Sequence, residues 1–128
     1  MPKVRVLIVD DSVTIRAMLE QVLGREPDFI LVGSAADAES ALGMIHQLHP
    51  DVVTIDIAMP GKDGLALLDA VRLNTHAVML TSKADAATDS FERGAFGFFH
   101  KAQILTDSRK LVKMVRAAAE GKRSKRAA

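Results

Sequence analysis

Three carboxylates follow two apolar segments of this 128-residue chain. Asp10 and Asp11 come directly after residues 4–9, and Asp56 ends a second apolar run, residues 52–55. Because the carboxyl ends of adjacent parallel strands meet at one edge of a sheet, we expect these side chains to converge. Like charges at such a short distance repel one another unless a cation lies among them. Carboxylate oxygens are hard ligands of the kind that Mg²⁺ prefers. The residues therefore predict a Mg²⁺ site beside one reactive carboxylate.

Two further polar residues close predicted strands and are expected at the same edge. Thr81 ends the fourth apolar run and Lys101 ends the fifth. Phosphoryl transfer needs an attacking oxygen, a metal held by carboxylates, and donors that meet the charge on the equatorial phosphoryl oxygens. An aspartate, a hydroxyl and an ammonium supply these parts. The five residues together predict phosphoryl transfer to an aspartate oxygen.

The positions of these residues depend on alternating strands and helices. Short apolar runs predict five strands: residues 4–9, 29–33, 52–56, 77–81 and 96–100. Helical spacing of apolar residues and end signals predict five helices: from Ser12 to Gly24, from Asp37 to His49-Pro50, from Gly64 through Val71, from Ala84 to Arg93, and from Asp107 onward. This α/β pattern indicates a doubly wound (βα)₅ fold, a flavodoxin-like three-layer sandwich with a five-stranded parallel sheet of order 2-1-3-4-5.

Composition favours one globular domain. Hydrophobic residues make up 48% of the chain and charged residues 26%, which is ordinary for a folded protein. Cysteine is absent, which excludes disulfides and thiol nucleophiles and is compatible with the cytoplasm, and no apolar run approaches the ~20 residues of a membrane span. Residues 122–128 form a basic segment, which we interpret as a solvated tail beyond a domain of residues 1–121. We therefore expect a cytoplasmic protein that binds neither membrane nor nucleic acid directly.

Four motifs resemble the receiver domain of two-component response regulators, and the likeness runs from Val4 to about Glu120. They are Asp10-Asp11-Ser12, the D-x-x-M-P-x-x-D-G run from Asp56 to Gly64, Thr81-Ser82, and the G-A-x-x-[aromatic]-x-x-K segment from Gly94 to Lys101. Details of the first two motifs are most similar to receivers attached to chemotaxis methylesterases. The resemblance implies a phosphoacceptor signalling protein rather than an enzyme.

The resemblance also assigns the acceptor and its metal ligands. Asp56 would accept a phosphoryl group from the phosphohistidine of a histidine kinase or phosphotransfer protein. Asp11, Asp56 and the backbone carbonyl of Ala58 would bind Mg²⁺ directly, while Asp10 would act mostly through water. The phosphorylated chain would then serve as a switch for a downstream effector protein or as a phosphorelay intermediate, as a monomer or weak homodimer.

By the same resemblance, three residues would read the phosphoryl group. Lys101 would pair with its oxygens, Thr81 would move to hydrogen-bond one of them, and Phe98 would turn inward. Side-chain alternation along the fifth strand independently places Lys101 with Phe99 on one face and Phe98 on the other. Most receivers have a cis-proline after the lysine, whereas this chain has Ala102. Because a non-proline cis bond costs about 3 kcal/mol, we predict a trans bond there.

Two other functions remain open from the sequence. A haloacid-dehalogenase-type phosphatase also uses aspartate, Mg²⁺, a hydroxyl and lysine, but its D-x-D-x-T motif after the first strand fails here, because Ser12 stands two residues after Asp10. The second alternative is a receiver-like binding module that works without phosphorylation. Absence of phosphorylation, together with partner binding that is unaffected by Asp56→Ala, would favour this module.

Overall fold

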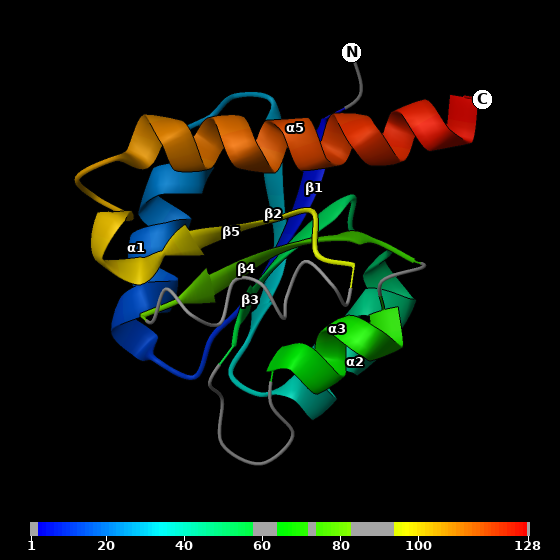
Figure 1. The fold of residues 1–128 in the computed structure, drawn as a ribbon, viewed down its shortest axis with the longest axis horizontal. Coiled ribbons are helices and arrows are strands. Elements are labelled where there is room, and N and C mark those ends of the chain that lie inside the picture. Colours follow the sequence, from blue (N-terminus) through cyan, green and yellow to red (C-terminus); the bar gives the residue numbers. More distant parts are fainter. Residues whose placement is uncertain (1–2, 58–63, 72–73, 83–93, 128) are drawn as a thin grey trace.

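The computed structural model describes residues 3–57, 64–71, 74–82 and 94–127 (Figure 1). Strands and helices alternate along them in this order: β1 (Val4–Val9), α1 (Val13–Gly24), β2 (Phe29–Ala35), α2 (Ala38–Leu48), β3 (Val52–Asp56), α3 (Gly64–Val71), β4 (His76–Thr81), β5 (Gly97–His100), the 3₁₀ helix η2 (Lys101–Gln103) and α5 (Ser108–Ala127). The helix predicted for residues 84–93 falls outside the described residues.

The strands form one parallel sheet of order β2-β1-β3-β4-β5, as the sequence predicts. Helices α1 and α5 cover one face, and α2 and α3 cover the other (Figure 1). Central strands buried on both faces explain why the chain shows continuous apolar runs instead of strict alternation. The three-layer fold is confirmed, and it places the carboxyl ends of β1, β3, β4 and β5 at one edge.

Each face of the sheet has its own apolar core. Residues of α1 and α5, including Leu19 and Leu111, pack on Ile8 and Val78 of the sheet, and all four are fully buried. On the opposite face, α2 and α3 pack against alternate residues of the same strands. The sheet is thus covered by one helical layer on each face.

Local signals in the sequence begin and end the first two helices. The Ser12 side chain accepts a hydrogen bond from the Ile15 backbone N–H at 3.2 Å, and Asp37 caps α2 through the Ser40 N–H at 2.7 Å. His49 ends α2 in the left-handed conformation, with φ of 48°. These cap residues agree with the sequence predictions, and the Ser12 cap starts α1 directly after the acidic pair.

The last helix is longer than its apolar stripe. The stripe ends at Ala119, yet the helical backbone of α5 continues through the basic segment to Ala127. The backbone of residues 122–127 is helical, and the division into a domain of residues 1–121 and a basic tail stays a prediction. No helix in the described ranges has the length and hydropathy needed to cross a membrane.

Candidate functional site

The three predicted carboxylates converge at the carboxyl edge of the sheet. Asp10 and Asp11 follow β1 and Asp56 ends β3, and these two strands pair in parallel as far as Val9 and Ile55. One carboxylate oxygen from each aspartate lies within 4.8 Å of the others. Asp10 and Asp56 are buried, whereas Asp11 is exposed. Three carboxylates this close, two of them removed from water, form a hard oxygen-donor set that fits a divalent cation such as Mg²⁺.

Lys101 is the cation that bridges the two buried carboxylates. Its Nζ lies 3.0 Å from Oδ1 of Asp56 and 3.1 Å from Oδ2 of Asp10. Burial alone lowers the pKa of Lys101, but hydrogen bonds and charge attraction from Asp56 and Asp10 outweigh it and raise the pKa above its ordinary 10.5. Lys101 is therefore charged at neutral pH. This ammonium offsets part of the repulsion between the two carboxylates that it contacts.

The turn between β1 and α1 holds Asp10 through its backbone and its side chain. The Ser12 N–H donates to Oδ1 of Asp10 at 2.9 Å, and the Asp10 N–H donates to the Ala35 carbonyl at 3.0 Å. Nη1 of Arg16 donates to the Asp10 carbonyl at 2.6 Å. Sequence reasoning missed Arg16, although a basic residue in a first helical turn, where the helix dipole disfavours cations, is a usable signal.

Thr81 and Phe98 occupy the neighbouring strand ends. Thr81 ends β4, is buried, and pairs across the sheet with His100 of β5. Phe98 is half-buried against the core on the α2/α3 face, while Phe99 lies in the core beneath α1 and α5. Lys101 reaches the carboxylates from the edge of β5. The alternation predicted for this strand is confirmed for Phe98 and Phe99.

The segment after Asp56 is described only at its two ends. Ala58, the predicted carbonyl ligand, lies outside the described residues, so its role stays a prediction. The N–H of Gly64, at the start of α3, donates to the Ile57 carbonyl at 3.0 Å. A Cβ at Gly64 would overlap the backbone oxygen of Asp56. Glycine is thus the residue that lets α3 begin this close to the site.

The turn after Lys101 has no cis peptide bond, and none occurs elsewhere in the described part of the chain. The trans Lys101–Ala102 bond therefore agrees with the prediction. The chain instead forms η2, closed by the Ile104 N–H donating to the Lys101 carbonyl at 3.2 Å. Ile104 itself is fully buried in the core beneath α1 and α5. This buried side chain ties the turn to the core.

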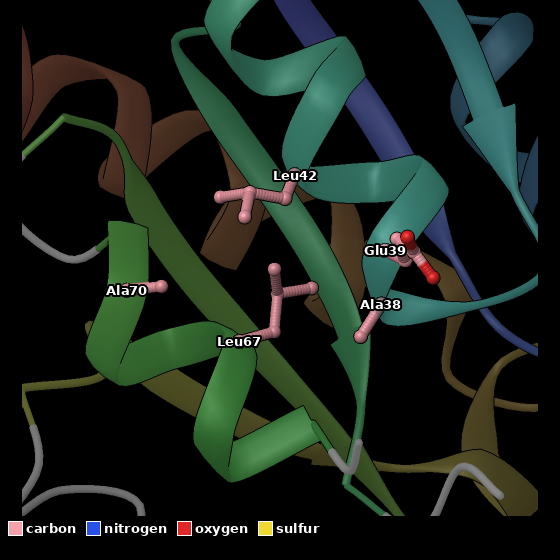
Figure 2. Close-up of a pocket in the computed structure, with 5 residues that line it drawn as sticks. All are labelled: Ala38, Glu39, Leu42, Leu67 and Ala70. Carbon is pink, nitrogen blue, oxygen red and sulfur yellow. The ribbon is translucent and has the colours of Figure 1, made fainter. Parts of the chain in front are cut away.

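A cavity of about 400 Å³ lies away from these residues, between α2 and α3 (Figure 2). Leu42, Leu67 and Ala70 point into the space, and Ala38 and Glu39 lie at one end of it. Its lining is mostly apolar and includes none of the predicted site residues. The three carboxylates and Lys101 lie together at the edge of the sheet and not at this cavity.

Known proteins share both the sequence pattern and the fold. The chain is 38% identical over 128 residues to a protein-glutamate methylesterase/protein-glutamine glutaminase of Dechloromonas aromatica, which covers 91% of this chain and 37% of that protein. A protein of the same description from Xanthomonas campestris is 45% identical over 107 residues, 79% of this chain and 30% of that protein. The chain therefore spans about a third of the length of these curated relatives.

Solved structures and a family model agree with those relatives. The crystal structure of the response regulator domain of Thermotoga maritima CheB superposes with a TM-score of 0.81 at 28% identity, over 92% of this chain and 97% of that one. In the CheX-CheY-BeF3-Mg+2 complex from Borrelia burgdorferi, the matched chain has a TM-score of 0.72 at 30% identity, over 86% and 90% of the two chains. The model of the response regulator receiver domain matches residues 6–116. The matched residues include Asp10, Asp56 and the Lys101 that bridges them. The chain therefore belongs to the family of response regulator receiver domains.

Proposed function

We propose that this receiver accepts a phosphoryl group on Asp56 and works as a phosphorylation-driven switch or phosphorelay intermediate. The observation that carries the proposal is the bridge from Lys101 Nζ to both Asp56, at 3.0 Å, and Asp10, at 3.1 Å. It places a charged donor beside the acceptor carboxylate, where charge would build up during phosphoryl transfer.

In the transfer step, a carboxylate oxygen of Asp56 attacks phosphorus in line. The new P–O bond forms as the P–N bond to the donor's phosphohistidine breaks, and the imidazole nitrogen keeps the electron pair of that bond. Lys101 meets the charge on the phosphoryl oxygens, and Thr81 supplies a hydroxyl from the end of β4. Asp11 and Asp56 would hold Mg²⁺ with the Ala58 carbonyl, and Asp10 would act through water. When bound, the ion neutralises charge on the transferring group.

The switch step follows from charge added next to β4 and β5. A phosphoryl group brings negative charge and acceptor oxygens, which favour a shift of Thr81 toward it. Phe98, half-buried on the face opposite Phe99, would then repack inward. Such a change shifts the populations of two conformations of a surface, and a downstream effector protein binds one of them in preference. The donor would be a histidine kinase or a phosphotransfer protein, and the chain would act as a monomer or weak homodimer.

The relatives' methylesterase and glutaminase activities are not part of this proposal. The matched region covers 37% of one relative and 30% of another, and the family model describes a receiver domain. The same family match argues against the haloacid-dehalogenase-type phosphatase. A binding module independent of phosphorylation remains the competing function, and it is the one that the experiment below tests.

Intact-mass analysis after incubation with Mg²⁺ and acetyl phosphate tests the proposal directly. We expect an added mass of one phosphoryl group that is labile at alkaline pH, disappears in Asp56→Asn, and is lost with a metal chelator. Asp37→Asn is a matched control, because Asp37 is an exposed aspartate beyond β2 and asparagine caps a helix equally well. No adduct from either acetyl phosphate or a phosphohistidine donor would refute the acceptor role and favour the binding module.

A further inference from the structure

The first turn of α1 carries a basic residue that the helix dipole disfavours. Arg16 is the fourth residue of this helix, close to its positive end. Its half-buried side chain turns back toward the sheet edge, where Nη1 donates to the Asp10 backbone oxygen at 2.6 Å. A cation in an unfavourable helix position needs a compensating contact. The Asp10 carbonyl, in a segment that carries two carboxylates, supplies it.

The oxygen bound by Arg16 belongs to the peptide unit that joins Asp10 to Asp11. The Asp10 side chain is already held, because Oδ1 accepts the Ser12 N–H and Oδ2 pairs with Lys101. Asp11 differs, since its side chain is exposed and forms no hydrogen bond or ion pair with the residues that the structure describes. The contact from Arg16 therefore fixes the peptide plane from which the least restrained carboxylate of the site projects.

We propose that Arg16 is a positioning residue of the cation site: by holding the Asp10 carbonyl, it orients Asp11 toward Asp10 and Asp56 and strengthens Mg²⁺ binding. The inference rests on the proposed function and deepens it, because it concerns the same site. Groups that hold metal ligands in place from outside commonly change metal affinity when they are removed. A guanidinium also repels a divalent cation, so loss of charge alone would tighten binding. The direction of the change separates positioning from simple charge.

Isothermal titration of the full chain with Mg²⁺ measures that direction. We expect Arg16→Ala to bind Mg²⁺ about tenfold more weakly than wild type. Arg16→Lys retains a charged donor and should recover most of the lost affinity, although lysine cannot copy the guanidinium geometry. Arg25→Ala is the matched control, because it removes an exposed arginine from the opposite end of α1. Its affinity should equal that of wild type.

A second measurement needs no metal. In ¹⁵N-labelled, metal-free protein, Arg16→Ala should shift the backbone amide resonances of Asp11 and Ser12, because the Asp11 amide shares the restrained peptide unit. Arg25→Ala should leave both resonances in place. Thermal unfolding followed by circular dichroism identifies any general loss of stability. If Arg16→Ala does not fold, Arg16→Gln replaces it in both assays, since it removes the charge and shortens the donor.

The outcomes distinguish this inference from the function on which it rests. Weaker Mg²⁺ binding by Arg16→Ala, recovered in Arg16→Lys and accompanied by the amide shifts, supports the positioning role. If the wild-type chain binds Mg²⁺ and accepts phosphoryl groups, and Arg16→Ala binds Mg²⁺ as tightly as the wild type or more tightly, the inference alone is overturned. A wild-type chain that neither binds Mg²⁺ nor accepts phosphoryl groups overturns both.

Discussion

Replacing Lys101 with methionine keeps an apolar stem and removes the cation that bridges Asp10 and Asp56. The two contacts, at 3.0 and 3.1 Å, join an 18% exposed lysine side chain to carboxylates that are 4% and 0% exposed. A charge-assisted hydrogen bond contributes about 1.5–3 kcal/mol, and removing one partner of a buried pair costs about 3–5 kcal/mol. Because Lys101 keeps some contact with water, we expect a loss near the lower limit, about 3 kcal/mol at pH 7 without metal.

Urea unfolding followed by far-UV circular dichroism measures this loss, since the chain has no tryptophan or tyrosine for fluorescence. With a urea dependence of about 1.5 kcal/mol/M, typical of a small domain, the midpoint should fall by about 2 M. Lys110→Met is the control, because Lys110 is an exposed lysine of α5. Added Mg²⁺ should narrow the gap between wild type and Lys101→Met, because the metal replaces the missing cation.

The pH dependence follows from the raised pKa of Lys101. A folded-state pKa above the ordinary 10.5 means that this stabilisation is fully present below 10.5 and is lost as pH rises through the folded value. The gap between wild type and Lys101→Met should therefore stay constant from about pH 7 to 9. A loss below about 1 kcal/mol, the range of exposed ion pairs, would refute the view that Lys101 neutralises a buried site. A gap that closes already between pH 7 and 9 would contradict the raised pKa.

Three further substitutions test the packing around the site, each by urea unfolding against wild type. Gly64→Ala should destabilise the protein by about 2 kcal/mol or more and slow phosphorylation, because its Cβ would overlap the Asp56 backbone oxygen; wild-type behaviour would contradict this close approach. Thr54→Val should stabilise by about 1 kcal/mol, since the buried Thr54 hydroxyl has no hydrogen-bond partner among the described residues, and a loss of stability would reveal one. Arg116→Met should cost about 1 kcal/mol, an effect that weakens in high salt, because its two acidic partners and its stacking on Phe29 are partly exposed. A difference in stability between wild type and Arg116→Met that does not change with salt concentration would argue against that ion-pair contribution.

The fold was predictable because its central strands β1, β3 and β4 are buried on both faces. The β1 and β3 bounds match the apolar runs, since each run ends where a polar residue reaches the sheet edge. At β2 the strand continues two residues beyond the predicted end, through Ser34 and Ala35. These residues pair with Ile8 and Val9 of β1, a long-range constraint that local composition does not contain.

The site, like the fold, could be predicted from the sequence only in part. Asp10, Asp11, Asp56 and Lys101 could be brought together from sequence, because parallel topology alone sends strand ends to one edge. Arg16 could not be placed, because its bond to the Asp10 carbonyl depends on the path of the turn and on one side-chain rotamer. Strand ends specify which chemical groups meet, and side-chain contacts from the flanking helices decide how firmly each is oriented.

Lys101 shows how a missing family feature can be offset by packing. Most receivers have a cis-proline at the next position, whereas here the bond to Ala102 is trans and Ala102 is exposed. Phe99 before Lys101 and Ile104 after it are both buried in the core beneath α1 and α5. These two anchors and η2 restrict the backbone on either side of Lys101 without a proline. The ammonium of Lys101 is therefore carried by a backbone segment whose two ends are anchored in the core.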